Sequence, residues 1–326
     1  MTKTVRAVVV AGALLLALGL ALGLAAPAPA QPAAKVHRLG WLSAAAHPMI
    51  EPFREGLRDL GYVEGKNLVI EQRYAHGKVE RLPSLADELV RLQIDLLIVS
   101  GRAAVQAVRA HAAQVPIVFV TGDPVADGIV ASLAQPGRNI TGMALMSGDI
   151  AAKWVELARD ALGASRIGIV SDPAGGKGQR SNAEEAARTL GLEWHSLEVR
   201  TIDEIEPAFQ GSVRRRTQAL IVLSSPFFAA ERARLVSAAA RYRLPVVYEH
   251  RDFVEKGGLI SYGPNVRDVF RRAAAHADKI LKGTPAGELP IEQPTKLELV
   301  VNLKTARALG LTIPQSVLLR ADAVLQ

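Results

Sequence analysis

The sequence predicts an α/β protein with two similar lobes, each containing a parallel β-sheet covered by helices on both faces. Short apolar strands alternate with amphipathic helices along most of the 326 residues, a pattern typical of right-handed crossovers between parallel strands. The order of segments also repeats, because RLG at residues 38–40 recurs as RIG at residues 166–168. Further pairs follow in the same order at nearly the same offset: residues 60–61 with 190–191, 98–100 with 222–224, and 115–118 with 244–247. Ordered matches of this kind indicate two copies of one unit.

The N-terminus has the features of a secretory signal peptide. Lys3 and Arg6 precede an uncharged apolar run over residues 7–26, and Ala28 and Ala30 occupy the A-x-A positions of a cleavage site. We therefore expect residues 1–30 to be a signal peptide, cleaved after Ala30 to leave a periplasmic protein. An apolar run of this length could also span a bilayer as a retained anchor. The chain contains no cysteine, which excludes a thiol-linked lipid anchor and disulfide bonds, so its core must hold the fold.

The charge of the mature chain does not indicate a nucleic-acid partner. Removing Lys3 and Arg6 with the signal peptide leaves 37 basic and 32 acidic side chains, a net charge of +5. The only run of three basic residues, at 214–216, falls late in a predicted helix whose apolar face is residues 205, 209 and 213, and cations suit the C-terminal end of the helix dipole. No nucleic-acid-binding module accompanies it.

The first half is expected to contain one complete unit. Its predicted strands are residues 38–42, 67–73, 95–99, 117–120 and 140–145, and its predicted helices are residues 52–60, 80–92, 103–112 and 125–133. Gly and Pro end several of these segments. We expect the chain to cross from one lobe to the other near residues 145–147.

The second half repeats this unit, and its last segments are expected to be shared between the lobes. After a strand at residues 259–264, the predicted segments are a helix at 266–281, a strand at 296–301 and a helix at 303–309. About 296 mature residues suit two domains. We assign residues 36–145 with about 264–285 to lobe one, and residues 147–262 with about 290–326 to lobe two. A second crossing is expected near residues 262–264.

Enzyme and metal motifs are absent from the sequence. It contains no G-x-S-x-G, H-E-x-x-H or G-x-x-x-x-G-K-[ST] pattern. The seven histidines show no metal spacing. We expect no cofactor, no metal and no catalytic activity.

Polar residues do follow the predicted strands at their carboxyl ends, the edge where open parallel sheets bind ligands. They are Ser43, Ser100-Gly101-Arg102, Thr121-Gly122-Asp123, Ser171-Asp172, Ser224-Ser225 and Tyr248-Glu249-His250. Helix N-termini at the same edge favour anions. Two such edges would form a cleft that closes on a small molecule by hinge motion. The alternative is that these residues only cap the following helices.

Arg102 suggests the nature of the ligand. A cation at a helix N-terminus opposes the helix dipole, so we expect Arg102 to bind a carboxylate of the ligand, bidentately. Asp123 or Asp172 would then hold an ammonium group, which gives an amino-acid-like ligand. The alternative is that Arg102 points into water, where the dipole effect is largely screened.

Aromatic side chains could enclose another part of the ligand. Tyr248 ends a predicted strand, Tyr262 lies at a predicted crossing, and Trp41 ends the first strand. Such groups often sandwich a planar or apolar moiety. Core or hinge packing is the alternative. The predicted ligand-binding residues are Ser43, Ser100, Gly101, Arg102, Thr121, Asp123, Asp172, Ser224, Tyr248 and Tyr262.

Four stretches resemble a known family: FREGLRDLGYVEGKNLVIEQRYAHGKVERLPSLADELV, VPIVFVTGDPVADGIVASLAQPGRNITGMAL, GGLISYGPNVRDVFRRAAAHADKILKG and LPIEQPTKLELVVNLKTARALGLTIPQSVLLRADAV. The chain resembles the exported substrate-binding proteins of ABC transporters with the type I periplasmic-binding-protein fold, nearest to the tryptophan/tyrosine-type group. The resemblance covers essentially the whole chain. It implies two Rossmann-like lobes joined by a multi-strand hinge, a monomer with its ligand in the cleft, and delivery to an ABC permease in the inner membrane.

Two positions depart from the pattern of that family. Gly101-Arg102 stands where the family usually has Gly and a small hydroxyl residue, and Asp172-Pro173 stands where it often has Asn-Pro. Both fall where a ligand is expected, so the family's specificity does not transfer to this chain. A periplasmic sensor without a permease would share all the features described so far. A secreted enzyme on the same fold would need a nucleophile or base poised by a partner, and the sequence shows no such pair.

Overall fold

The computed structural model describes residues 35–326 except 47, 112–113, 146 and 176. The chain divides into two compact units, residues 1–36 and 37–326, and the fold below is that of the second unit. The predicted signal peptide lies outside the described residues. Within the described part of the chain, no helix has the length and apolar character needed to cross a membrane.

Lobe one is built on a five-stranded sheet with the order β2-β1-β3-β4-β5, all parallel. The strands are β1 (His37–Ser43), β2 (Leu68–Tyr74), β3 (Leu96–Ser100), β4 (Ile117–Thr121) and β5 (Ile140–Ala144). Both faces of this sheet are buried, as expected for parallel strands. Along β3, Leu96 and Ile98 pack into one core while Leu97 and Val99 pack into another.

Four helices cover the two faces of the first sheet: α2 (Ile50–Asp59), α3 (Leu82–Arg91), α4 (Arg102–His111) and α11 (Val266–Leu281). Side chains of α2 and α11, such as Phe53 and Phe270, share the core of one face. Side chains of α3 and α4, such as Leu85 and Val105, share the core of the other. Short 3₁₀ turns occupy Val79–Arg81, Ile202–Glu204 and Ala286–Glu288.

Lobe two is built on a seven-stranded sheet with the order β12-β11-β10-β9-β8-β6-β7. The strands are β6 (Arg166–Ser171), β7 (Glu193–Glu198), β8 (Ala219–Val222), β9 (Val246–Tyr248), β10 (Ile260–Pro264), β11 (Leu297–Asn302) and β12 (Ala323–Leu325). Neighbouring strands are parallel except β10 and β11, which are antiparallel.

Helices also cover both faces of the second sheet. They are α5 (Ser147–Asp160), α6 (Lys177–Thr189), α7 (Ile205–Arg214), α8 (Pro226–Ala230), α9 (Arg232–Arg241), α10 (Arg251–Glu255), α12 (Leu303–Leu309) and α13 (Gln315–Leu318). Side chains of α5 and α6 enter one core with Ile167 and Ile169 of β6. Side chains of α7 to α10 enter the other core with Val170. Sheets with helices on both faces confirm the predicted α/β architecture.

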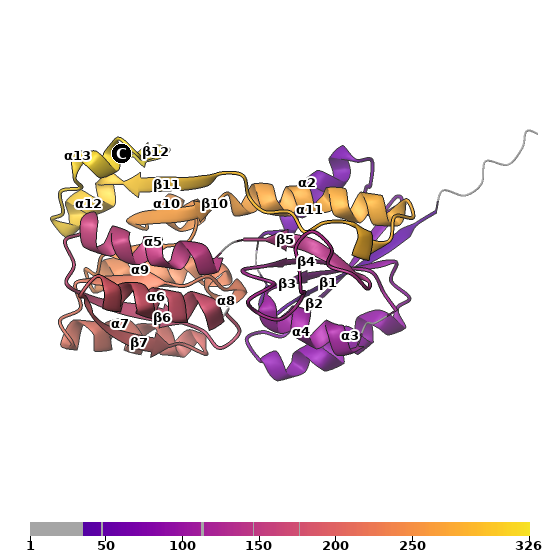
Figure 1. The fold of residues 1–326 in the computed structure, drawn as a ribbon, viewed down its shortest axis with the longest axis horizontal. Coiled ribbons are helices and arrows are strands. Elements are labelled where there is room, and N and C mark those ends of the chain that lie inside the picture. The colour runs from indigo at the N-terminus through magenta and orange to yellow at the C-terminus, as the bar shows by residue number, and fades with distance from the viewer. Residues whose placement is uncertain (1–34, 47, 112–113, 146, 176) are drawn as a thin grey trace, which may run out of the picture. The chain divides into compact units, whose positions relative to one another are not determined.

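The chain passes between the two sheets after β5, after β10 and before β11 (Figure 1). Before β11 it runs beside β5, where the Ala144 N–H donates to the Glu292 carbonyl (2.9 Å) and the Glu292 N–H donates to the Gly142 carbonyl (3.0 Å). Several crossings, rather than one linker, therefore join the lobes. The residue boundaries that we assign to each lobe stay a prediction.

The predicted helix at residues 125–133 is wrong. The chain makes a single turn there, and one carboxylate oxygen of Asp123 caps this turn by accepting from the N–H groups of Val125 (3.1 Å) and Ala126 (2.9 Å). Gly128, with φ of 68°, then turns the chain away, so β4 and β5 are joined without a helix.

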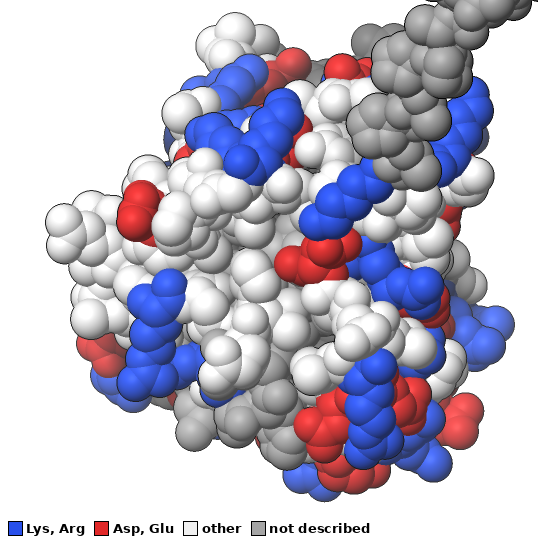
Figure 2. Space-filling model, turned by 90° about the vertical axis from the view of Figure 1, so that its right-hand side faces the viewer, with Lys and Arg blue, Asp and Glu red and all other residues white. Residues whose placement is uncertain are grey.

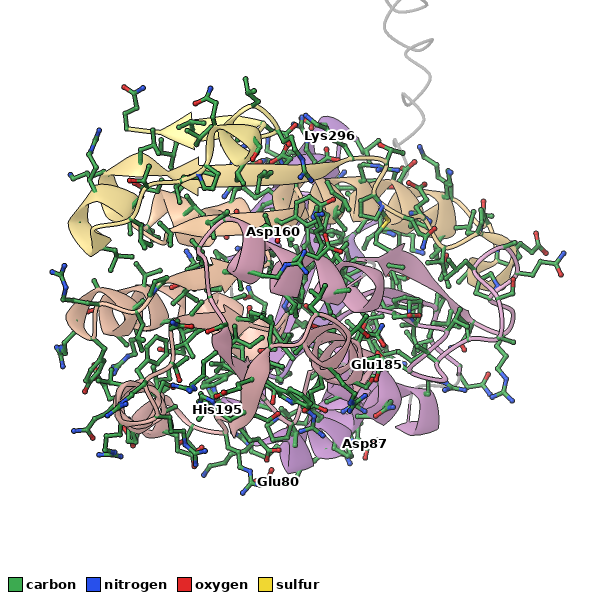
Figure 3. All side chains as sticks on the ribbon, turned by 60° about the vertical axis from the view of Figure 1, so that its left-hand side comes forward. Glu80, Asp87, Asp160, Glu185, His195 and Lys296 are labelled. Carbon is green, nitrogen blue, oxygen red and sulfur yellow. The ribbon has the colours of Figure 1, made fainter. Side chains whose placement is uncertain are left out.

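Charged side chains of both signs lie close together on the surface. On the face drawn in Figure 2, Lys and Arg lie beside Asp and Glu rather than in one continuous basic area. Asp160, Glu185 and Lys296, which Figure 3 labels, are exposed. Exposed ion pairs of this kind contribute little stability each, which leaves the buried apolar cores to hold the fold.

Candidate functional site

A cavity of about 50 Å³ lies where the carboxyl ends of β3 and β4 face those of β8 and β9. We call it the inner cavity. Its walls come from both lobes: Met49, Ser100, Gly101, Arg102, Val120, Thr121, Gly122, Leu145, Val266 and Phe270 from one, and Ala174, Gly175, Gln179, Ser224, Ser225, Pro226, Ala229, Glu249 and His250 from the other. This is the edge at which open parallel sheets bind ligands.

The wall from lobe one combines small polar groups with an apolar floor. Ser100 and Thr121 end β3 and β4, and both are nearly inaccessible to solvent. Gly101 turns the chain from β3 into α4 with φ of 88°, a conformation that glycine adopts readily. Met49 and Phe270 form part of the floor and belong to the core of lobe one.

The wall from lobe two carries a buried acid. Burial raises the pKa of Glu249 to about 7, against the smaller effect of a hydrogen bond from Ser224. His250 Nε2 lies 3.4 Å from Glu249 Oε1, and burial lowers the pKa of His250 to about 3, so its imidazole is neutral. Among the described residues, none forms a hydrogen bond with His250 Nδ1. Glu249 therefore faces the cavity without a cationic protein partner among the residues described here.

Backbone contacts hold the rest of this wall in place. The side-chain amide of Gln179 accepts from the Ser224 N–H (2.8 Å) and donates to the Ser224 carbonyl (3.2 Å). The Ser225 hydroxyl caps α8 by accepting from the Phe228 N–H (3.0 Å). The polar groups of lobe two are thus positioned by α6 and α8, not only by the strands.

Arg102 reaches from lobe one to lobe two. Its Nε donates to the Gly175 carbonyl (2.9 Å) and its Nη2 donates to the Pro173 carbonyl (3.1 Å). A third donor, Nη1, binds the side-chain oxygen of Gln106 (3.0 Å). Asp127 lies 3.9 Å from Nε, and burial raises the Asp127 pKa to about 6 although the Arg102 charge opposes that shift.

Comparison with known proteins decides the family. The model of the ABC transporter substrate binding protein family matches residues 44–325. The chain belongs to this family. The family consists of binding proteins, which confirms the prediction that this chain is not an enzyme.

Individual relatives agree with this family assignment. The tyrosine-binding protein of Clostridioides difficile (strain R20291) is 25% identical over 292 residues, covering 85% of this chain and 82% of that protein. A conserved domain protein from Vibrio cholerae O1 has a TM-score of 0.81 and 27% identity, covering 89% of this chain and all of that one. An ABC domain from Streptococcus pneumonia, solved in complex with L-Trp, has a TM-score of 0.78 at 24% identity over the same share of each chain, and this likeness shows the fold alone.

Five of the predicted ligand-binding residues of this substrate-binding protein line the inner cavity: Ser100, Gly101, Arg102, Thr121 and Ser224. The others do not. Ser43 is fully buried at the end of β1, and Asp123 closes the turn described above. One carboxylate oxygen of Asp172 accepts from the N–H groups of Ala174 and Gly175 (3.0 Å for the second).

The predicted aromatic residues also lie outside the inner cavity. Tyr248 has no exposed surface and stacks on Phe253 at 4.7 Å between ring centroids. Trp41 is likewise buried, against Phe53 and Phe270. Tyr262 lies in β10, where its carbonyl accepts from the Trp154 indole (2.6 Å). Core packing, the alternative considered for these residues, describes Trp41 and Tyr248 in this structure.

The predicted set misses four polar residues of the cavity wall: Gln179, Ser225, Glu249 and His250. Ser225, Glu249 and His250 lie just after the ends of strands β8 and β9 and carry the same signal as the predicted residues. Gln179 lies inside α6, so no strand end marks it. Among the described residues, no group of three or more His, Asp or Glu side chains is arranged to hold a metal ion.

Proposed function

We propose that this protein is an exported binding protein that captures an amino acid and delivers it to an ABC permease in the inner membrane. Membership of the substrate-binding family supports a transport role. The signal-like residues 1–30 support export. Two similar proteins are described as tyrosine-binding and as bound to L-Trp, which supports an amino acid as the class of ligand.

The observation that carries the proposal is the placement of a cation and a buried acid on opposite walls of the inner cavity. Arg102 stands on the wall from lobe one and the buried acid Glu249 on the wall from lobe two. A ligand ammonium beside Glu249 would favour the ionised carboxylate. A ligand carboxylate beside Ser100 and Thr121 would face two small hydroxyl residues and the N–H groups that begin α4.

Glu249 replaces the two acids that the sequence suggested for the ammonium group. The oxygens of Asp123 and Asp172 that accept hydrogen bonds are engaged by nearby backbone N–H groups. Neither residue lines the inner cavity, whereas Glu249 does. The guanidinium of Arg102 already binds two carbonyls of lobe two, so we propose that its charge attracts the ligand carboxylate while its bonds hold the lobes together.

A thermal-shift screen of the common L-amino acids tests the class of ligand. An amino acid present at about 100 times its dissociation constant should stabilise the protein by about 2.7 kcal/mol. The N-acetylated form of the same amino acid lacks the ammonium group and should produce no shift. If every amino acid leaves the melting temperature unchanged, the proposed ligand class is wrong.

Uptake of the labelled amino acid by intact cells tests delivery to a permease. Cells that lack this protein should lose high-affinity uptake and regain it when the gene is restored. Unchanged uptake, combined with tight binding in vitro, would support a sensory role instead.

A further inference from the structure

His250 has a polar side chain on the wall of the inner cavity that packing alone does not explain. It lies between β9 and α10, and its side chain is only 2% exposed. The ring packs against Phe253 in an edge-on arrangement, at 4.9 Å between ring centroids, and it does not cap α10. A phenylalanine at residue 250 would offer the same kind of apolar contact, so the two ring nitrogens have no role in this packing.

The two ring nitrogens of His250 have different surroundings. Nε2 lies 3.4 Å from Glu249 Oε1, whereas Nδ1 is buried and has no hydrogen-bond partner in the described part of the chain. Burial, and to a smaller extent the charge of Arg232, lower the pKa of His250 to about 3, so the imidazole is neutral. An ionised Glu249 favours the tautomer with its hydrogen on Nε2, and Nδ1 is then a hydrogen-bond acceptor.

A ligand in the inner cavity determines whether this acceptor is paired. A buried acceptor without a hydrogen bond is unfavourable, and a ligand that displaces water from one must replace the bond that it removes. Three other histidines have a buried ring nitrogen without a hydrogen-bond partner among the described residues, but His37, His195 and His276 do not line the inner cavity. His250 therefore combines such a nitrogen with a place on the cavity wall.

We propose that His250 selects amino acids whose side chain carries a hydroxyl or N–H group, which donates a hydrogen bond to Nδ1. The inference rests on the proposed amino-acid function and specifies its substrate, because the ligand ammonium favours the ionised form of the neighbouring Glu249. A site that binds a ligand hydroxyl or N–H in this way discriminates against the analogue that lacks the group, since its buried acceptor is then left unpaired.

A second cavity beside the inner one provides a control. We call it the outer cavity, and its walls include Lys78 from lobe one and Thr201 from lobe two. Ala174 belongs to the walls of both cavities, whereas Glu249 and His250 line the inner one and not the outer one. A ligand side chain in the outer cavity would meet Thr201 rather than His250. Thr201→Val, which removes a hydroxyl at nearly constant shape, is therefore the matched control.

Calorimetric titration with pairs of amino acids that differ in one donor tests the proposal. The pairs are L-serine and L-alanine, L-threonine and L-2-aminobutyrate, L-tyrosine and L-phenylalanine, and L-tryptophan and 3-benzothienyl-L-alanine. In wild type and Thr201→Val, the member with the donor should bind at least about tenfold more tightly in the pair that binds best, or about 1.4 kcal/mol. His250→Phe should bring this ratio close to one, and His250→Asn should retain part of it, because its side-chain oxygen is an acceptor.

Two results would overturn the proposal: wild-type protein that binds both members of every pair equally, or a ratio that His250→Phe leaves unchanged. The second result is expected if His250 contacts only the ligand ammonium, which all of these amino acids share. The wild-type measurement tests the proposal even if His250→Phe does not fold. Failure of every amino acid to bind would overturn the proposed function and this inference together. Amino-acid binding without a preference for the donor would overturn the inference alone.

Discussion

Glu249 couples the site to pH. Burial raises its pKa from 4.5 to about 7, so the folded protein retains a proton that the unfolded chain releases between these values. The unfolded state then binds fewer protons, and the free energy of unfolding decreases as pH rises. This stabilising effect is fully present below pH 4.5 and is lost as pH rises through about 7. The pKa of Asp127 is also raised, to about 6, so this residue likewise makes the free energy of unfolding decrease as pH rises.

Glu249→Gln should therefore make the ligand-free protein less sensitive to pH, because glutamine does not ionise. Melting temperatures at pH 5 and pH 8 should differ less in this variant than in wild type, with Asp127 contributing part of the remaining difference. Glu255→Gln is the matched control, since Glu255 is exposed and paired with Arg251 (2.8 Å). Equal pH dependence in all three proteins would show that Glu249 titrates normally.

Affinity should have the opposite dependence on pH. An ammonium group favours the ionised form of Glu249, so the affinity for an amino acid should fall by up to about tenfold for each unit of pH below 7. At pH 8, Glu249→Gln should weaken binding by about 1.5–3 kcal/mol, the range for hydrogen bonds to charged groups. Calorimetry at pH 6 and pH 8 measures both effects. An affinity that is constant over this range would exclude contact between the ammonium and Glu249.

Single residues of the site were predictable where they follow a strand. Ser100 and Thr121 end the neighbouring parallel strands β3 and β4, which brings them to one edge of the first sheet, and Ser224 follows β8 at the facing edge of the second sheet. Glu249 carries the same signal as Tyr248, the residue that the sequence predicts for the site, but the side chain of Tyr248 packs in the core. Successive side chains of a strand point to opposite faces. The sequence therefore shows which edge of the sheet forms the site, but not which of two adjacent residues faces the ligand.

At the scale of elements, the approach of α4 to α8 depends on Gly101. A Cβ atom at this position would lie 2.6 Å from Cγ of Pro226, which begins α8 in lobe two. Atoms at this distance clash, and proline cannot rotate away. A side chain at residue 101 would therefore hold the lobes apart.

Gly101→Ala should accordingly prevent full closure and weaken amino-acid binding. The matched control is Gly61→Ala, because Gly61 has a similar φ of 90° with no atom within 4 Å of the added Cβ. In each variant the left-handed backbone lowers the free energy of unfolding by about 1–2 kcal/mol. Only in Gly101→Ala does the added methyl group also clash with a residue of the opposite lobe, Pro226. In small-angle scattering, ligand should reduce the radius of gyration of wild type and Gly61→Ala and not of Gly101→Ala. Normal closure of Gly101→Ala would contradict the steric argument.

Most helices and strands were predictable from periodicity, because the central strands of both sheets are short, apolar and buried on both faces. Residues 125–133 were the exception. Their apolar spacing is typical of a helix, but the positive φ of Gly128 (68°) ends the turn that Asp123 caps. Gln179 and Phe270 reach the site from inside α6 and α11, and helical periodicity does not distinguish a side chain in a cavity from one in a core.

At the scale of the whole molecule, export is the first prediction. Residues 1–30 combine basic residues, an apolar run and an A-x-A site. The intact mass of protein recovered from the periplasm should correspond to a chain that begins at Gln31. A mass that still includes Met1 to Ala30 would contradict cleavage and favour a retained membrane anchor.

The two lobes and their multiple crossings were predictable from the repeated order of segments. The volume of the site was not predictable from the sequence. It depends on hydrogen bonds from Arg102 to carbonyls 71 and 73 residues away in the chain, and on the contact between Gly101 and Pro226 across the lobes. No local pattern in the sequence encodes these distances.

The most direct test is a crystal structure of the protein with the amino acid that gives the largest thermal shift. We expect the ligand in the inner cavity, with its ammonium within hydrogen-bond distance of Glu249 and its carboxylate beside Ser100 and Thr121. Density for the ligand in the outer cavity, or at a site formed by one lobe alone, would contradict the account.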